Sequence, residues 1–220
     1  MLVYHGSPEP DFKPFYGGGR EYHDYGKGLY CVEDETAAKE WACQHVGIGT
    51  SYVYSYDLDF IGLSPKLDLN EYAPIYWISA LAQHRYSASE SHVRRKRRLR
   101  LIECFPVNCE NYELIRGWRA NDRYFAFLNS FIGLDISYEA VVQAMMLGDL
   151  GQQVVIKGKE AYNRLVQVDR VAVGEAEYTK YRDSYLARDL SAKSALRQVL
   201  DVPGRMLDEI ISDPKGVLAK

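Results

Sequence analysis

Short runs of β-type residues alternate irregularly with helical stripes along this chain. Strand-like runs are expected at residues 2–5, 28–32, 51–58, 111–115, 152–158 and 166–173. Helical periodicity predicts helices at residues 33–46, 72–87, 122–131, 137–147 and 159–165. Because strands and helices do not follow a regular βαβ order, the pattern predicts an α+β fold and not a doubly wound parallel sheet.

The composition is that of an ordinary globular protein with one core. The chain has 220 residues, 47% hydrophobic and 26% charged, and a net charge of -3 gives no overall attraction to nucleic acid or to an anionic membrane. After residue 173 the composition shifts to a charged helical pattern, interrupted at Pro203 and Gly204. We therefore expect a domain at residues 1–173 and a helical extension at residues 174–220.

The cysteine spacing and the N-terminal residues indicate where in the cell the protein is expected. The four cysteines form no C-x-x-C pair, so we expect free thiols and no metal site. The first residues lack the basic start and apolar run of a signal peptide, and no apolar run is long enough for a spanning helix. These features predict a cytoplasmic protein without a membrane partner.

A glycine- and tyrosine-rich segment occupies residues 3–31. Such glycine density is typical of tight turns, or of a backbone that comes close to a ligand, and the aromatic residues suggest a planar ligand. The long loop at residues 7–28 is therefore expected to be functional or mobile. We expect the run at residues 17–19 to provide flexibility and not a phosphate cradle, and we assign no role to His23.

Residues 93–101 contain six basic side chains. The simpler interpretation is a solvated strand edge or loop. The alternative is a patch, from Arg94 to Arg100, for a phosphate-bearing partner such as nucleic acid.

Three features follow one another along the chain: H-G-S from His5, G-K-G-L-Y ending at Tyr30, and the aromatic Trp41 beyond it. In this order they resemble the ADP-ribosyltransferases of the diphtheria-toxin and poly(ADP-ribose) polymerase type, whose motif set is His, then Tyr, then Glu, Asp or Gln. Three longer stretches resemble a bacterial family of uncharacterised domains grouped with these transferases. They are D-Y-G-K-G-L-Y at residues 24–30 with E-W-A at residues 40–42, R-G-W-R-A-N-D-R at residues 116–123, and Q-V-V-I-K at residues 153–157. The resemblance covers about residues 2–172 and implies two packed small antiparallel sheets, flanked by helices, with NAD between them.

The resemblance also implies roles for individual residues. His5 would bind the adenosine ribose, the Gly6 backbone would bind the nicotinamide amide, and Tyr30 with Trp41 would enclose the nicotinamide ring. Arg20 would hold the pyrophosphate. The NAD-binding set expected in this way is His5, Gly6, Ser7, Arg20, Gly28, Tyr30 and Trp41. The simpler alternative is that His5 and Tyr30 are half-buried strand residues and that Arg20 is a solvated loop residue.

Two glutamines compete for the third motif position. Strand alternation puts Gln152 on the better core face, so Gln153 is expected to face the cleft, as the resemblance also implies. The catalytic set is then His5, Tyr30 and Gln153. A glutamine can bind a ribose hydroxyl but has no charge and cannot act as a general base. Asn121 and Asp122 are accessory candidates, with Asp122 as the possible carboxylate or simply a helix cap.

The function implied by the resemblance is mono-ADP-ribosylation, a pentosyl transfer from NAD to a macromolecular acceptor with release of nicotinamide and without a metal. Proteins with such domains are often bacterial toxins or effectors, so an antitoxin-like partner is expected. Three alternatives remain open: an NAD glycohydrolase, a catalytically inactive NAD-binding module, and a nucleic-acid binder.

Overall fold

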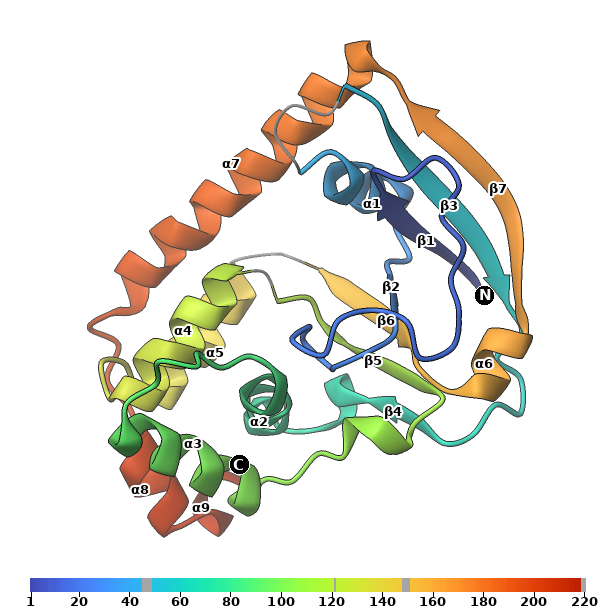
Figure 1. Cartoon of the computed structure of the whole chain (residues 1–220). Coiled ribbons are helices and arrows are strands. Elements are labelled where there is room, and N and C mark those ends of the chain that lie inside the picture. The colour runs from blue at the N-terminus through green and yellow to red at the C-terminus, as the bar shows by residue number, and fades with distance from the viewer. Residues whose placement is uncertain (45–48, 121, 148–150, 219–220) are drawn as a thin grey trace.

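The computed structural model of the chain describes residues 1–44, 49–120, 122–147 and 151–218 (Figure 1). The first sheet is antiparallel and has the order β1-β3-β7, formed by Leu2–Ser7, Ser51–Leu58 and Leu165–Val173. The second has the order β2-β6-β5-β4, formed by Leu29–Cys31, Gln152–Ile156, Leu114–Trp118 and Lys66–Asp68.

These two sheets confirm the predicted α+β class. Two departures concern β4: the strand was not predicted, and it pairs with β5 in parallel, so the second sheet is not purely antiparallel. The edges of the two sheets meet at one antiparallel bridge, where the amide of Tyr4 donates to the carbonyl of Val32 at 2.8 Å and the return bond is 2.9 Å. This bridge brings β1 beside β2.

The helices are arranged around the second sheet and along one side of the molecule (Figure 1). They are α1 (Glu35–Ala42), α2 (Pro74–His84), α3 (His92–Cys104), α4 (Asp122–Gly133), α5 (Tyr138–Leu147), α6 (Lys159–Asn163), α7 (Glu175–Val199), α8 (Leu207–Ser212) and α9 (Lys215–Leu218), with 3-10 turns at Leu69–Glu71 and Cys109–Asn111. No helix in the described part of the chain combines the length and the apolar character needed to cross a membrane.

The second sheet is buried on both faces. Leu114, Val154 and Ile156 pack against side chains of the first sheet, including Val3 and Leu58. The opposite face lies in the largest apolar cluster, with residues of α2, α4 and α5. Alternation along β6 therefore does not separate a core face from an open face, contrary to the sequence-based expectation.

The basic run at residues 93–101 forms helix α3 and not the expected strand edge or loop. Ser91 caps the helix by accepting from the amide of Arg94 at 3.3 Å, and arginine and lysine are good helix formers. Three of its arginines pair with acids of neighbouring segments: Arg94 with Asp135, Arg97 with Asp208 and Arg98 with Glu90. Arg100 pairs with Glu103 of the same helix. Much of the positive charge is therefore neutralised within the protein.

Other boundaries agree more closely. The strand at residues 51–58 and the Ser137 cap are confirmed, since Ser137 Oγ accepts from the amide of Ala140 at 3.1 Å. β1 continues through Gly6 to Ser7, and β5 begins at Leu114 and not at residue 111. The predicted first helix starts after its N-cap Asp34, while residues 45–48 at its expected end lie outside the described residues.

The helical extension shares the core with the rest of the chain. As predicted, the helices break around Pro203 and Gly204, between α7 and α8. Tyr178 and Tyr181 of α7 are buried in a cluster with residues of α1 and β3. Figure 1 shows α7 running from the end of β7 to the region of α4 and α5, and it contacts α1, α4 and α5.

Candidate functional site

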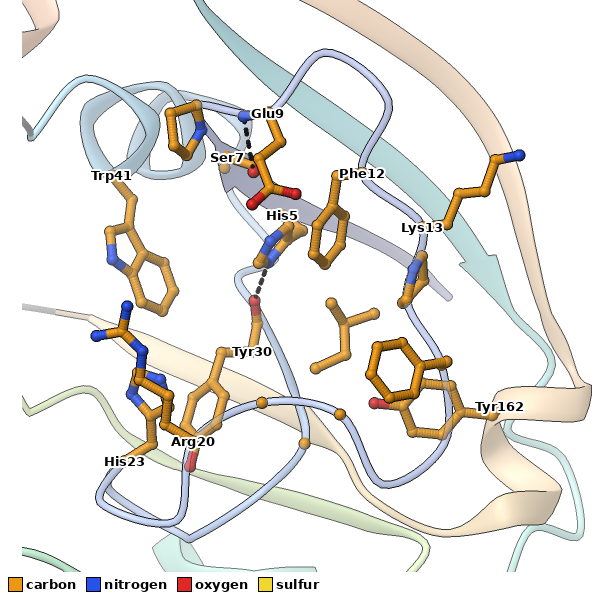
Figure 2. Close-up of a pocket in the computed structure, with 18 of the residues that line it drawn as sticks. His5, Ser7, Glu9, Phe12, Lys13, Arg20, His23, Tyr30, Trp41 and Tyr162 are labelled. Carbon is orange, nitrogen blue, oxygen red and sulfur yellow. Dashed lines mark hydrogen bonds between the residues drawn. The ribbon is translucent and has the colours of Figure 1, made fainter. Parts of the chain in front are cut away.

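A cavity of about 430 Å³ lies between β1, α1 and the loop that follows β1 (Figure 2). Every residue of the predicted NAD-binding set lines it, namely His5, Gly6, Ser7, Arg20, Gly28, Tyr30 and Trp41. These residues come from β1, the glycine-rich loop, β2 and α1. The structure thus brings together side chains that the sequence separates.

Gly6 and Gly28 occupy places where a side chain would not fit. A Cβ on Gly6 would overlap the carbonyl oxygen of Ala38 and would lie 2.7 Å from the amide nitrogen of Ala42. A Cβ on Gly28 would lie 2.8 Å from Cγ1 of Val155. The two glycines therefore allow β1 to lie close to α1 and the loop to lie close to β6.

His5 has a defined tautomer. Its Nδ1 lies 2.8 Å from the carbonyl oxygen of Tyr30, which can only accept, so Nδ1 carries the proton. Burial lowers the pKa of His5 to about 4, so the ring is neutral near pH 7 and Nε2 is an acceptor. Phe12 stacks on the ring with centroids 4.4 Å apart (Figure 2).

The ring of Tyr30 is held by its own hydroxyl group. This hydroxyl donates to the carbonyl of Gly26 at 2.7 Å and accepts from the amide of Tyr25 at 2.9 Å. Burial raises the pKa of Tyr30 well above its ordinary value, so the phenol stays neutral. The side chain therefore offers the cavity an aromatic surface and no charge.

His23 also lines the cavity, contrary to the sequence-based view that it has no role there. Its ring lies against Tyr30, with centroids 4.9 Å apart, and beside Arg20 in the close-up (Figure 2). Burial, Arg85 and Arg20 all lower the pKa of His23. The ring is thus a neutral aromatic group packed against Tyr30 at a tilt.

The site has cationic side chains both at its exposed surface and in the protein interior beside it. Arg20 and Lys13 line the cavity as exposed side chains. Arg119 is buried, and its guanidinium carbon lies 4.4 Å from the ring centroid of Trp41. Burial lowers the pKa of Arg119. The cavity thus has exposed positive charge at its surface and a buried guanidinium behind its tryptophan.

Gln153 is buried, only 1% exposed, and does not line the cavity. Tyr30 pairs with Val155 across β2 and β6, so Tyr30 and Gln153 share one face of the sheet. The Gln153 amide nitrogen donates to Asp24 Oδ2 at 2.9 Å and to the carbonyl of Trp118 at 3.2 Å. The third motif residue therefore lies behind the cavity and not on its surface, contrary to the expectation that Gln153 faces the cleft, because this face of β6 is packed against the main apolar cluster.

The accessory candidates are not placed in the site. Asn121 lies outside the described residues, and Asp122 starts α4 with its side chain outside them as well. The sequence analysis assigned no role to Asp24, Phe12 or Arg119. Arg119 belongs to the motif at residues 116–123 and Asp24 to the stretch at residues 24–30, but neither motif indicates the contacts that these side chains make. Within the described ranges, no group of three or more His, Cys, Asp or Glu side chains is arranged to hold a metal ion.

Comparison with curated proteins and with solved structures found no match. A family model described as "Protein of unknown function (DUF3990)" matches residues 1–166, which is most of the chain, and the protein therefore belongs to this family.

Proposed function

We propose that the cavity binds NAD and that the protein transfers ADP-ribose from it to a macromolecular acceptor, releasing nicotinamide. One observation carries the proposal. The complete NAD-binding set named from motif resemblance, including His5, Tyr30 and Trp41, lines a single cavity of about 430 Å³. A chance resemblance has no reason to select residues that converge in space.

The chemistry of the cavity walls suits the parts of NAD. The free Nε2 of neutral His5 accepts from a ribose hydroxyl. Tyr30 and Trp41 offer aromatic faces to the cationic nicotinamide ring, which favours such surfaces. Arg20 and Lys13 supply positive charge for the pyrophosphate.

Nicotinamide binding between Tyr30 and Trp41 requires His23 to move. Its ring now lies against Tyr30 with an angle of 44° between the ring planes, and unlike its buried neighbour Asp24 it is only half-buried. A change of side-chain rotamer at His23 therefore opens the aromatic surface without moving the backbone.

In the proposed reaction the bond between C1′ of the nicotinamide ribose and the ring nitrogen breaks. Its electron pair neutralises the pyridinium, and an acceptor nucleophile forms the new bond to C1′ and loses its proton. In this proposal the cavity opens toward β6 when NAD binds, so that Gln153, which lies behind the cavity surface, binds a ribose hydroxyl. Gln153 cannot take the proton of the acceptor nucleophile. The reaction is therefore a single transfer to an acceptor that is already nucleophilic, and chain elongation is disfavoured. An antitoxin-like partner that blocks the cavity belongs to the same proposal.

The test is incubation of the protein with NAD labelled in its adenosine part, followed by chromatography and by mass spectrometry of a treated lysate. Nicotinamide together with a labelled macromolecule supports transfer. Nicotinamide with free ADP-ribose identifies a glycohydrolase, whereas tight NAD binding without nicotinamide identifies a binding module. The absence of both binding and turnover contradicts the proposal.

Matched variants assign the residues. His5→Ala is expected to abolish turnover, while His92→Ala, which changes an exposed histidine at the start of α3, leaves it intact. Gln153→Ala is expected to lower turnover at least about a hundredfold, because a group that acts on the developing charge is lost. Gln152→Ala is the neighbouring control, and a larger loss in Gln152→Ala than in Gln153→Ala would show that the wrong glutamine has been assigned.

A further inference from the structure

The carboxylate of Asp24 lies directly behind Gln153. Asp24 is 4% exposed, and its Oδ2 accepts from Gln153 Nε2 at 2.9 Å and from the amide of Ala120 at 2.9 Å. Its Oδ1 lies 3.1 Å from Nε of Arg85. The glycine-rich loop, β6 and the segments after β5 and α2 thus converge on one carboxylate.

These contacts fix the orientation of the Gln153 amide. The carboxylate of Asp24 and the carbonyl of Trp118 are both acceptors, so the NH₂ group of Gln153 must face them. The two ends of an amide point in different directions, and Oε1 is therefore directed away from both acceptors. A glutamine held in this way presents an acceptor to a hydroxyl group.

The segment that carries Asp24 is built into the core. The adjacent Tyr25 is 0% exposed, and its hydroxyl donates to the carbonyl of Trp118 at 2.8 Å. Its amide donates to the hydroxyl of Tyr30 at 2.9 Å. Phe15 and Tyr16 of the same loop are by contrast 69% and 58% exposed. Asp24 thus belongs to the buried part of the loop and holds Gln153 from a fixed position.

We propose that Asp24 is a positioning residue that orients the Gln153 amide and supplies, one hydrogen bond away, the negative charge that a glutamine lacks. This inference rests on the proposed function. In the transferase chemistry, positive charge develops at C1′ as nicotinamide leaves, and a fixed negative charge nearby stabilises it. Neither Asp24 nor Gln153 lines the cavity, so the inference requires the cavity to open to Gln153 when NAD binds. Asp24 then acts through its hydrogen bond to Gln153.

The charges around Asp24 set the expected pH dependence. Burial raises the pKa of Asp24, while Arg85, the Gln153 and Ala120 donors and Arg119 lower it. His23, Tyr25 and Tyr30 are neutral neighbours near pH 7. Protonation removes the charge and one acceptor position, so turnover falls as the pH falls through the raised pKa of Asp24.

Two substitutions separate charge from geometry. Asp24→Asn keeps one acceptor oxygen for Gln153 and removes the charge, whereas Asp24→Ala removes both. We expect Asp24→Asn to lower kcat about ten- to a hundredfold with little change in KM, by analogy with the hydrogen-bond partners that orient metal ligands. Asp24→Ala is expected to lose more. Asp183→Asn, at an exposed position of α7, is the matched control.

Two measurements distinguish a positioning role of Asp24 from a purely structural one: the pH dependence of turnover, and the activity of a double variant in which the carboxylate is moved from position 24 to position 153. The Asp24→Asn variant should lack the acid limb that belongs to Asp24. Gln153→Glu alone places two carboxylates within hydrogen-bonding distance and should be inactive near pH 7, whereas Gln153→Glu combined with Asp24→Asn should recover activity. An unchanged kcat in Asp24→Asn, or no recovery in the double variant, overturns the proposal. Thermal melting identifies any variant that fails to fold.

Failure of the inference can be told from failure of the proposed function. If the wild-type protein releases no nicotinamide, the proposed function fails. The orientation is still tested by NMR, with the Gln153 side-chain NH₂ signal assigned through its loss in Gln153→Ala. This signal should shift in Asp24→Asn and should titrate with Asp24. A signal insensitive to both overturns the role of Asp24 whether or not the protein turns over NAD.

Discussion

The Nδ1 atom of His5 and the carbonyl oxygen of Tyr30 are 2.8 Å apart, so a hydrogen bond joins the first two motif residues across the wall of the cavity. The bond holds the imidazole in one tautomer. It also ties β1 to β2, which belong to different sheets.

Burial of neutral His5 makes stability depend on pH. Its pKa is lowered to about 4 in the folded protein, whereas an unfolded histidine titrates near 6.5. Between these values the unfolded chain binds more protons, so the free energy of unfolding falls as the pH falls from about 6.5 to about 4, by about 2–3 kcal/mol. Urea unfolding of the wild type and of His5→Gln over this pH range tests the prediction, because the free energy of unfolding of the variant should lack the decrease that is due to His5. Parallel curves for the two proteins would contradict the prediction.

Gly6→Ala is expected to disrupt the contact between β1 and α1. The added Cβ would overlap the Ala38 carbonyl and approach the backbone of Ala42, and neither can move without displacing the helix. The predicted loss in the free energy of unfolding is about 3 kcal/mol, at the upper end for overpacking. Gly174→Ala is the control because a Cβ added there would have no neighbouring atom within 4 Å. Equal stability of the two variants in chemical denaturation would show that β1 does not lie this close to α1.

Arg98 is expected to be structural and not to bind nucleic acid. Its Nε lies 3.0 Å from Oε2 of Glu90, its NH1 donates to Ala82 at 3.2 Å, and its side chain is 8% exposed. Arg98→Ala leaves a nearly buried Glu90 without this partner and should cost about 3 kcal/mol. The exposed neighbour Arg95 should cost less than about 0.5 kcal/mol when changed to alanine. Thermal melting measures both, and a strongly salt-dependent affinity for RNA or DNA that is lost in Arg95→Ala would instead favour the nucleic-acid alternative.

The helical extension is expected to be needed for a stable fold. Glu40 of α1 is 2% exposed and accepts from Ser184 Oγ at 2.6 Å, while Arg188 Nε lies 3.2 Å from its other oxygen. Arg188→Ala should lower the free energy of unfolding by about 1–2 kcal/mol, because a buried carboxylate loses a charged partner. Leu190→Ala, at a 62% exposed position on the same helix, is the control. Residues 1–173 alone should melt well below the full chain, and an unchanged melting temperature would show that the extension is independent.

Much of the fold follows from local patterns. Strand alternation predicted Ser51–Leu58 and a serine cap predicted the start of α5, because both signals depend only on neighbouring residues. The segment Lys66–Asp68 was missed because three residues carry no period, and its pairing with Leu114–Trp118 depends on distant sequence. α3 was misjudged because its charges suggested a solvated segment, whereas their acidic partners lie elsewhere in the chain.

The candidate site was predictable where a residue type has one evident use. Gly6 and Gly28 stand where only a glycine fits, and Tyr30 and Trp41 face the same cavity. The environment of Gln153 was not predictable from alternation, because helices cover the second face of its sheet. Asp24 begins the D-Y-G-K-G-L-Y stretch, but that stretch does not indicate its role, which comes from contacts with residues that are distant in sequence.

The carbonyl oxygen of Trp118 accepts from Tyr25, Trp77 and Gln153, at 2.8, 3.1 and 3.2 Å. This acceptor belongs to the backbone, so every amino acid at position 118 would supply it. The three donors are side-chain groups, so a substitution at any of these three positions can remove the hydrogen bond. Mutational tolerance around this point should therefore be asymmetric: a saturation library would accept replacements of Trp118 that keep its packing, while Tyr25, Trp77 and Gln153 would tolerate few.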